Sequence, residues 1–466
     1  MSTFSGLNTA YTGLTAARKG LDVVGQNVAN ANVAGYTRQR LNTSAAPSLA
    51  PAGRFAAPTG VGQGVSVDSI ARLGSQQLDT RVRSTAAVAG YSAVRANALI
   101  ELEDGFNEPG KNGLSTALQN FSAAWDGISH NPSDNTAAAV LLSAASTAAG
   151  QIANGYNAVR DQWNSTRSGL NDMVTELNSS AKQLASLNGA IRSTLASGAS
   201  ANELVDQRNA LATTIAALSG ATVRESSDGM VDVLIDGNAL VSGTNARSLQ
   251  VTGGKTMDDA QEPVVGWTDR PGSAGIGKGE IAGATSLLAS AGNGGVFAQA
   301  AASYNEVAAS LASSVNELHR QGATTAGIAG GDFFSVGTPA ATTLATVPTD
   351  ASGIASGRPG SGTLDGGIAD QIAQLGSKAG SADKVWSAFV TATASQSRAE
   401  LQQATLADVA SSSALDLQLS NASVDLDEEN VNLLMYQHAY QGASRVMSAI
   451  DEMLDTLINR TGIVGR

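Results

Sequence analysis

The chain has 466 residues, a formal net charge of −12, 42% hydrophobic residues and no cysteine. The acidic balance argues against non-specific nucleic-acid binding, which needs a basic face, and the missing cysteines exclude disulfides and thiolate chemistry. We find no run of about 18 apolar residues, so we expect no membrane insertion, and the length suits about three domains.

Residues 1–40 are predicted to form an amphipathic helix that ends near Gly35. Its apolar side chains recur at intervals of three and four, which is typical of a helix that buries one stripe. The stripe consists of Phe4, Leu7, Tyr11, Leu14, Ala17, Leu21, Val24 and Val28. Gly6, Gly13 and Gly20 lie seven residues apart, which lets a neighbouring backbone approach but weakens the helix by about 1 kcal/mol per glycine. We therefore expect this helix to be disordered in the free monomer.

The stretch from 42 to 75 is rich in Pro, Gly and Ser and becomes strand-like over 61–70, and helix returns over 76–128. Asn131-Pro132 breaks the pattern before a long helix over 133–196. Five large apolar residues of that helix fall seven apart, which predicts helix-on-helix packing. They are Trp163, Leu170, Leu177, Leu184 and Ile191. Ser200 and Glu203 fit a capping box for the helix that follows, up to about 219.

Short strands and turns are predicted from about 221 to 278, and the turn Asp236-Gly237-Asn238 separates two of them. Helix resumes over 281–320, and 322–380 is rich in Gly, Ala and Thr with weak strand signals. From about 381 the chain is predicted to be helical to its end, and Asp425 with Glu428 can cap the last helix.

The last helix carries a second apolar stripe with the same spacing as the first. It consists of Met435, Ala439, Ala443, Val446, Ile450, Met453 and Leu457. Residues 1–40 hold four cations and one acid, whereas residues 425–466 hold seven acids and three arginines. Opposite charge and placement at both ends favour pairing and intermolecular use of the two helices, although ordinary packing within one chain is the alternative.

The predicted fold is mainly α with inserted β-rich domains, and its long helical bundle or coiled-coil core closes with both terminal segments. The expected domains are 1–45 with 428–466 for the terminal helices, 46–220 with 281–321 and 381–427 for the bundle, 221–280 for the β-rich insert and 322–380 for a small insert.

Two motifs near the ends carry a family resemblance. Residues 26–40 read QNVANANVAGYTRQR, and residues 424–429 read VDLDEE, followed by Tyr436-Gln437 and Ala439-Tyr440-Gln441. This pair resembles the terminal signatures of bacterial flagellar rod, hook and hook-associated proteins. Three internal stretches, at 62–72, 204–211 and 315–319, are similar to the hook-associated proteins of the hook–filament junction.

The resemblance implies a structural adaptor that assembles as a ring at the hook tip and contacts the hook protein, other copies of itself and the next junction protein. It also implies type III export without a cleaved signal peptide, a cytoplasmic chaperone on the C-terminal helix, and a final place outside the cell in the flagellum. Beside the two stripes, the motifs add Asn27, Asn30, Gly35, Tyr36 and Tyr440 to the candidate assembly residues.

We expect no catalytic residue, cofactor or metal. The segment from Gly272 to Lys278 fits a phosphate-binding loop, but Gly279 replaces the Ser or Thr that would hold Mg²⁺. His130, His319 and His438 lack a partner at metal-ligand spacing, so packing or surface roles are expected. A hook or rod component, a wall hydrolase and a secreted adhesin with the same termini are the alternative functions.

Overall fold

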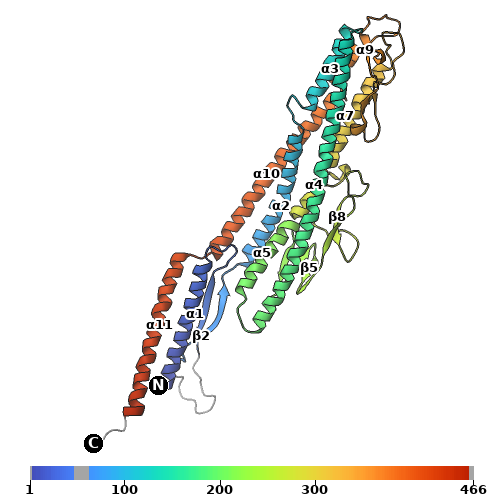
Figure 1. Cartoon of the computed structure of the whole chain (residues 1–466). Coiled ribbons are helices and arrows are strands. Elements are labelled where there is room, and N and C mark those ends of the chain that lie inside the picture. The colour runs from blue at the N-terminus through green and yellow to red at the C-terminus, as the bar shows by residue number, and fades with distance from the viewer. Residues whose placement is uncertain (1–2, 47–61, 461–466) are drawn as a thin grey trace, which may run out of the picture.

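The computed structural model describes the backbone of residues 3–46 and 62–460 and the side chains of 5–46 and 62–459. Val61 and the Phe4 side chain, both named in the sequence predictions, therefore lie outside the described residues. Figure 1 shows an elongated molecule with α1, α11 and both termini at one end and with α3, α7 and α9 near the other.

The described part of the chain is mainly helical and holds four small sheets. Its helices are α1 (Thr3–Asn30), α2 (Gln76–Gly105), α3 (Leu114–His130), α4 (Asn135–Ala196), α5 (Asn202–Ser219), α6 (Gly279–Leu287), α7 (Val296–His319), α8 (Ala340–Thr343), α9 (Gly367–Ala373), α10 (Ala382–Ala422) and α11 (Leu426–Asp455). Its strands are β1 (Gln39–Ala45), β2 (Val65–Arg72), β3 (Thr222–Glu225), β4 (Val231–Ile235), β5 (Asn238–Ser242), β6 (Asn245–Ala246), β7 (Leu249–Thr252), β8 (Val264–Trp267), β9 (Phe334–Ser335) and β10 (Ala345–Thr346). The fold class expected from the sequence, mainly α with β inserts, is confirmed.

The bundle core forms around the 62-residue helix α4, which packs against α3, α5 and α7. The predicted heptad row of α4 is the centre of this core, because each of its five side chains is at most 2% exposed. Aromatic rings fill the far end, where Trp125 of α3 contacts Phe333 at 5.0 Å between ring centroids. The long period-seven pattern therefore predicted a core correctly.

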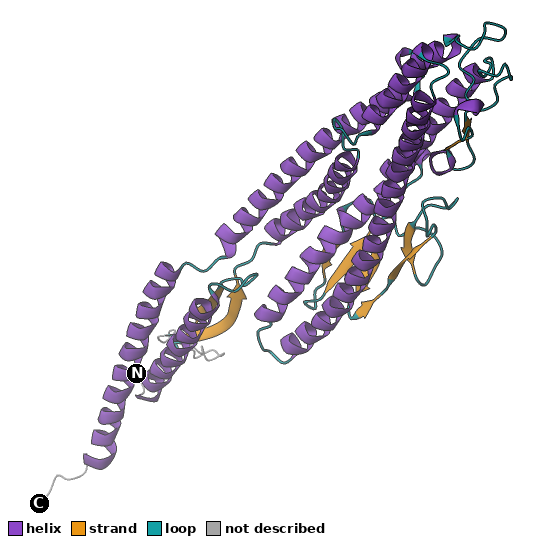
Figure 2. Cartoon of the chain, turned by 45° about the horizontal axis from the view of Figure 1, so that its top comes forward, coloured by secondary structure: helices purple, strands orange, loops and turns teal. Residues whose placement is uncertain are grey.

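The β-rich segment lies along α4 (Figure 2). Strands β3 to β6 form an antiparallel sheet in chain order, and β7 pairs with β8. The buried Asn188 of α4 donates from Nδ2 to the carbonyl oxygens of Val231 (2.8 Å) and Gly243 (2.7 Å). Such side-chain amides satisfy backbone groups where a strand meets a helix, and the sequence pattern did not predict them.

Four element boundaries differ from the predictions. Helix α1 ends at Asn30 instead of near Gly35, and Gln39–Ala45 pairs with Val65–Arg72 as a hairpin. The helix expected over 76–128 is two helices, because residues 106–113 include Pro109, which lacks the N–H that a helix needs. The helix expected over 281–320 is α6 and α7, with glycines between them.

The predicted capping box of α5 is wrong. Ala201 precedes the helix and makes no side-chain cap. The Glu203 carboxylate instead accepts a hydrogen bond of 2.9 Å from Gln39 Nε2, a tertiary partner that the local pattern could not reveal. The cap expected at the last helix is present, since Asp425 accepts from the N–H groups of Asp427 and Glu428.

One helix of the described residues, α4, is long and apolar enough to span a membrane by length and composition. Leu141, Ala145 and Ile152 of this helix lie in the bundle core and are fully buried, although Val140 is 56% exposed and a third of the apolar window is buried. We therefore interpret the apolar stretch as core packing.

Candidate assembly surface

Helices α1 and α11 lie side by side and antiparallel (Figure 1). The three glycines of the α1 heptad row face a matching row of α11. A Cβ atom added at Gly6 would lie 3.2 Å from Ile450, at Gly13 it would lie 3.8 Å from Ala443, and at Gly20 it would lie 2.4 Å from the Tyr436 ring. The glycine spacing thus serves close helix contact, as the sequence predicted.

The predicted apolar stripe of α1 is wider than the face of α1 that contacts α11. Ala17 and Val24 are buried, each 3% exposed, whereas Tyr11 is 60% and Val28 is 42% exposed. Leu7, Leu14 and Leu21 are half-buried. The β1–β2 hairpin covers another side of the helix, where the N–H of Val65 donates to Thr12 Oγ1 at 3.3 Å.

On α11 the face toward α1 is turned from the predicted stripe. The more buried side chains of this helix belong to Glu429, Asn432, Tyr436, Ala443, Met447, Ile450 and Leu454. Of the predicted residues Ile450 is 7% exposed, whereas Met435, Val446, Met453 and Leu457 are more than half exposed and Tyr440 is 39% exposed. The stripe as a whole therefore does not pack on α1, because one neighbouring helix covers only a narrow face.

Asn27 is the centre of a polar junction between the helix pair and the bundle. It is 1% exposed, and its Nδ2 donates to the carbonyl oxygen of Gln39 (2.9 Å) and to Glu429 Oε2 (3.2 Å). Its Oδ1 accepts from the N–H of Gln39 and from the Tyr36 hydroxyl, each at 2.9 Å. Burial, with the nearby carboxylates of Glu203, Asp206 and Glu429, raises the pKa of Tyr36 to about 12, so this hydroxyl stays a donor.

Arg38 joins the same junction to α11. Its Nε donates to Glu429 Oε1 at 2.8 Å, and its Nη1 donates to Glu428 Oε2 at 2.8 Å. The hydrogen bond from Arg38 lowers the pKa of the Glu428 carboxyl. The Arg38 backbone N–H donates to the carbonyl oxygen of Ala422 at 2.8 Å, so the residue also ties the end of α10. A buried charged pair with this many hydrogen bonds fixes geometry.

A second carboxylate, Asp206 of α5, holds the other side of the junction. It accepts from the backbone N–H of Thr37 at 3.0 Å and from Arg72 Nε. Beside it, the Asp79 carboxylate of α2 accepts from Gln418 of α10. The two chain connections between the terminal region and the bundle, after β2 and after α10, therefore meet the segment that follows α1 in one polar cluster.

The structure separates the residues of the first motif by role. Asn27 and Tyr36 lie in the junction, whereas the Asn30 amide donates to Gln26 within α1 at 2.9 Å. Gly35 is exposed and has a φ of +79°, a conformation that glycine adopts without strain. Sequence reasoning assigned no role to Asp79, Arg72 or Asp206. For Arg72 and Asp206 the only signal was their place inside the internal stretches at 62–72 and 204–211.

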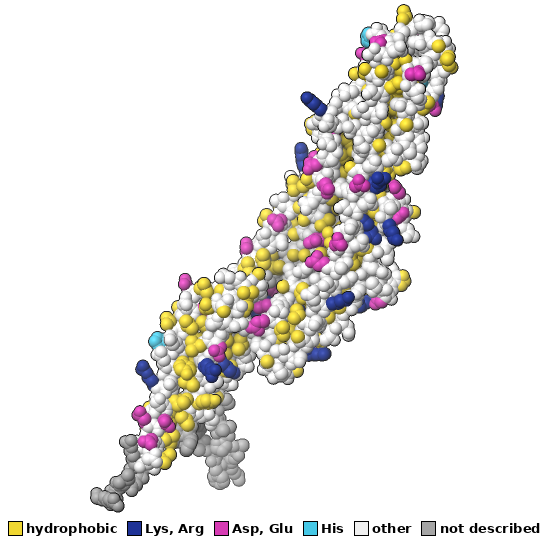
Figure 3. Space-filling model, viewed as in Figure 1, with side chains coloured by type: hydrophobic (Ala, Val, Ile, Leu, Met, Phe, Trp, Pro, Cys, Tyr) yellow, Lys and Arg dark blue, Asp and Glu magenta, His cyan; other side chains and the backbone are white. Residues whose placement is uncertain are grey.

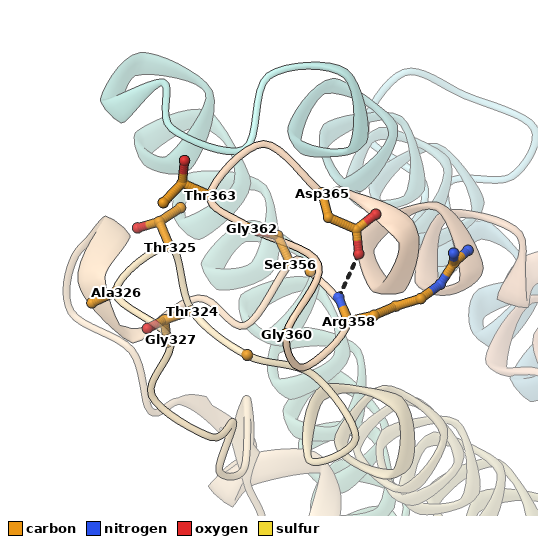
Figure 4. Close-up of a pocket in the computed structure, with 12 residues that line it drawn as sticks. Thr324, Thr325, Ala326, Gly327, Ser356, Arg358, Gly360, Gly362, Thr363 and Asp365 are labelled. Carbon is orange, nitrogen blue, oxygen red and sulfur yellow. Dashed lines mark hydrogen bonds between the residues drawn. The ribbon is translucent and has the colours of Figure 1, made fainter.

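A separate cavity of about 350 Å³ lies at the far end of the molecule (Figure 4). Two loops form it, and the N–H of Arg358 donates to Asp365 Oδ2 at 2.6 Å beside it. Backbone, small residues and the hydroxyls of Thr324 and Thr325 make up most of its wall, while the Arg358 side chain extends away from those threonines. We assign it no role.

The residues that the sequence analysis considered for phosphate or metal binding pack within the fold or lie on its surface. The loop from Gly272 leads into α6, and Gly279 lies against the backbone of α5, where an added Cβ would be 2.6 Å from the Ala217 carbonyl oxygen. His319 is buried, whereas His130 and His438 are exposed. Within residues 3–46 and 62–460 no group of His, Asp and Glu side chains could hold a metal ion.

Comparison with known proteins defines the class. The model of the flagellar basal body rod protein matches residues 7–37, and the C-terminal model of the rod proteins FlgE, FlgF and FlgG matches residues 418–460. These two segments cover most of α1 and all of α11, so the molecule is a structural protein of the bacterial flagellum.

The family follows from the middle of the chain. The model of the helical domain of flagellar hook-associated protein FlgK matches residues 99–334, about half of the chain. The chain belongs to the FlgK family of flagellar hook-associated proteins.

Two similar proteins carry the name of a hook-associated protein. Flagellar hook-associated protein 1 of Bacillus subtilis is 28% identical over an alignment of 528 residues that covers all of both chains. The protein of the same name from Escherichia coli is 28% identical over 72% of this chain and 60% of its own. The solved FlgK structure from Burkholderia pseudomallei has a TM-score of 0.47 and 26% identity, and the match covers 56% of this chain and 47% of that one.

Proposed function

We propose that this chain forms the first layer of the junction between the flagellar hook and filament, as a ring of copies at the hook tip. The observation that carries the proposal is the family match over 99–334 combined with a full-length relative named hook-associated protein 1. In this role the chain contacts the hook protein, its own copies and the next junction protein, and it catalyses no reaction.

The exposed apolar residues of α11 support the proposal physically. Met435, Val446 and Met453 are each more than half exposed on a helix whose main partner is α1. Exposed apolar rows of this kind are typical of surfaces that another protein covers. We propose that a cytoplasmic chaperone covers this helix before type III export, and that neighbouring subunits cover it outside the cell.

The four-part domain division given above belongs to the same proposal. The terminal segments 1–45 and 428–466 would form the assembly domain, and the inserts at 221–280 and 322–380 would lie away from it. The weak glycine-bearing helix would order fully only when neighbours bury it. Limited proteolysis of the dilute monomer tests this part: rapid loss of 1–40 and 430–466 is expected, and protected ends would contradict it.

Electron microscopy of cells that lack the gene, with an assay for flagellin in the medium, tests the position of the protein. Complete hooks without filaments, together with secreted flagellin, are the expected result. Missing hooks would place the protein in the rod or hook instead. Normal filaments would show that filament assembly does not need this protein.

A further inference from the structure

Two arginines are buried beside the polar cluster and form no ion pair. Arg83 of α2 is 7% exposed, and Arg208 of α5 is 4% exposed. On the face shown in Figure 3, by contrast, Lys and Arg side chains lie at the surface, interspersed with Asp and Glu. Moving an ionised group out of water costs several kcal/mol unless an opposite charge and hydrogen bonds compensate for it. These two guanidinium groups therefore need partners.

Arg83 has no polar partner in the chain. Among residues 5–46 and 62–459, no ion pair or side-chain hydrogen bond involves it. Burial lowers the pKa of Arg83, and the more distant carboxylates of Asp79 and Glu225 oppose that shift. A guanidinium group carries only donors, so the donors of Arg83 find no acceptor among the described residues.

Arg208 is only partly satisfied. Its Nη1 donates to a backbone carbonyl oxygen at 2.7 Å and its Nη2 to Asn209 Oδ1 at 3.5 Å, while its Nε is buried without a partner. Burial lowers the pKa of Arg208, and the charges of Arg72 and Arg83 lower it further. Glu225 attracts both buried arginines, but it is exposed, so water and salt screen its charge.

A cavity of about 100 Å³ adjoins Arg83 where α2, α5, α10 and the segment after α1 meet. Asp79 and Asp206 also line it, and both carboxylates already accept hydrogen bonds from other parts of the fold. Arg72, Arg83 and Arg208 therefore lie beside two buried carboxylates, which leaves one positive charge in excess. This cavity differs from the larger one at the far end because a buried charge without a partner lines it.

We propose that this cavity binds a small oxyanion, such as phosphate or sulfate, on the Arg83 guanidinium group. Planar guanidinium groups hold oxyanions through paired N–H donors. The cavity of about 100 Å³ is also larger than the share of about 30 Å³ that one molecule takes in liquid water. The anion supplies the acceptors that Arg83 lacks, balances the excess charge and joins α2 to α5. Water molecules are the alternative occupants, and they bring no charge.

The site goes beyond the proposed function and does not depend on it. Arg83, Arg208, Asp79 and Asp206 all belong to the bundle helices α2 and α5, so the purified full-length chain tests the site whether or not its terminal helices are ordered.

Thermal melting of the purified chain gives the first readout. Inorganic phosphate at low millimolar concentration, in a chloride buffer of constant ionic strength, should raise the melting temperature, because a ligand that binds only the folded state stabilises it. Sulfate should act in the same way. Arg83→Met removes the charge, so it should abolish this rise. Without phosphate the same variant should melt above the wild type, because it removes a buried charge that has no partner.

Arg81→Met is the matched control, since it makes the same substitution at an exposed position two residues earlier on α2. It should keep the wild-type response to phosphate, including any general effect of phosphate on protein stability. Arg83→Lys keeps the charge but loses the planar pair of donors, so it should respond more weakly than the wild type.

Titration calorimetry of the wild type with phosphate gives a second readout that needs no variant to fold, and saturable binding at one site is expected. No saturable binding would leave water as the occupant and would overturn the proposal. Equal phosphate responses in the wild type and in Arg83→Met would also overturn it, because the effect would then belong to the protein surface in general. An Arg83→Met chain that fails to fold, or that melts below the wild type with and without phosphate, would assign Arg83 a structural role instead.

Discussion

The bundle and the terminal helix pair both carry apolar rows at helical spacing, and the two rows differ in exposure. Along α4 the row from Trp163 to Ile191 is at most 2% exposed, because helices from several parts of the chain surround it. Along α11 the row of Met435, Val446 and Met453 is more than half exposed. The α4 row is thus packed within one chain, whereas the α11 row remains exposed.

The prediction with the largest expected effect compares one residue of the α4 row with one residue of the α11 row. Leu184→Ala should lower the free energy of unfolding of the bundle by about 2–5 kcal/mol, because it leaves a cavity at a fully buried position. Met453→Ala should change monomer stability by less than about 0.5 kcal/mol, because its side chain is half exposed. Urea titration of both variants measures their free energies of unfolding, and equal losses of stability would contradict the difference between the two rows.

Removal of a buried carboxylate should loosen the terminal pair alone. Glu429→Ala leaves Arg38 and Asn27 without their shared acceptor, which should cost about 3 kcal/mol locally. In isolated hook preparations, where neighbours bury the terminal helices, hydrogen exchange in α1 should then accelerate while exchange in α4 stays slow. Glu428→Ala is the matched control, because its partly exposed carboxylate contacts the same arginine, and it should change exchange little. Equal acceleration in both variants would argue against the junction.

Two glycines of α1 offer a sharper test of close packing. Gly20→Ala places a methyl group 2.4 Å from the Tyr436 ring, and overpacking of this kind costs about 1–3 kcal/mol. Gly25→Ala meets nothing within 4 Å and should stabilise the helix by up to about 1 kcal/mol. In isolated hook preparations, hydrogen exchange of α1 in the two variants should therefore change in opposite directions. A stabilised Gly20→Ala protein would show that the helices do not approach closely.

The smallest effect is a pH dependence at the far end of the bundle. His319 is 1% exposed, its Nδ1 donates to the Gly331 carbonyl oxygen at 2.8 Å, and its Nε2 accepts from the N–H of Ala355 at 2.9 Å. Burial lowers the pKa of His319, while the Gly331 contact and the Asp332 carboxylate oppose that shift. The neutral ring therefore stabilises the fold above the unfolded pKa of about 6.5, and this stability is lost as pH falls below it.

Thermal melts between pH 5 and pH 7.5, a range chosen around the ordinary histidine value of about 6.5, measure this effect. The wild-type protein should lose stability on the acid side, and His319→Gln should lose most of that pH dependence. His130→Gln is the control: His130 is exposed, and its pKa is raised by a hydrogen bond to the Asp126 backbone. An unchanged profile in His319→Gln would assign the acid sensitivity to other groups.

Long periodic patterns predicted the helices and their buried faces well, whereas short motifs at helix ends predicted the helix starts less well. The period-seven row of α4 and the turn at Asp236 both lie where the pattern placed them. The capping box at Ser200 is absent because α5 begins at Asn202 with Ala201 as its N-cap, and Glu203 accepts a hydrogen bond from the distant Gln39. One tertiary hydrogen bond can replace the contacts of a local capping motif, but it cannot replace the burial of five large side chains in a row.

The candidate assembly surface was predictable in part. Both stripes and the glycine row were visible in the sequence, and the terminal helices do pair. Which members of each stripe stay exposed was not visible, because an apolar arc of a helix is wider than the face that one neighbouring helix covers. The junction residues Asp79, Arg72 and Asp206 carried no periodic signal, since polar clusters are assembled from distant segments.

The sequence by itself determined the helical class, the family resemblance and the close approach of the two ends, because each depends on local periodicity or on contiguous motifs. Only the tertiary structure decided that α11 turns Ile450 inward and Val446 outward, and that Glu429 of α11 accepts hydrogen bonds from both Asn27 and Arg38. The physical reason is that side-chain exposure and ion pairing depend on which neighbour lies opposite, and residues 402 positions apart become neighbours only in the folded chain.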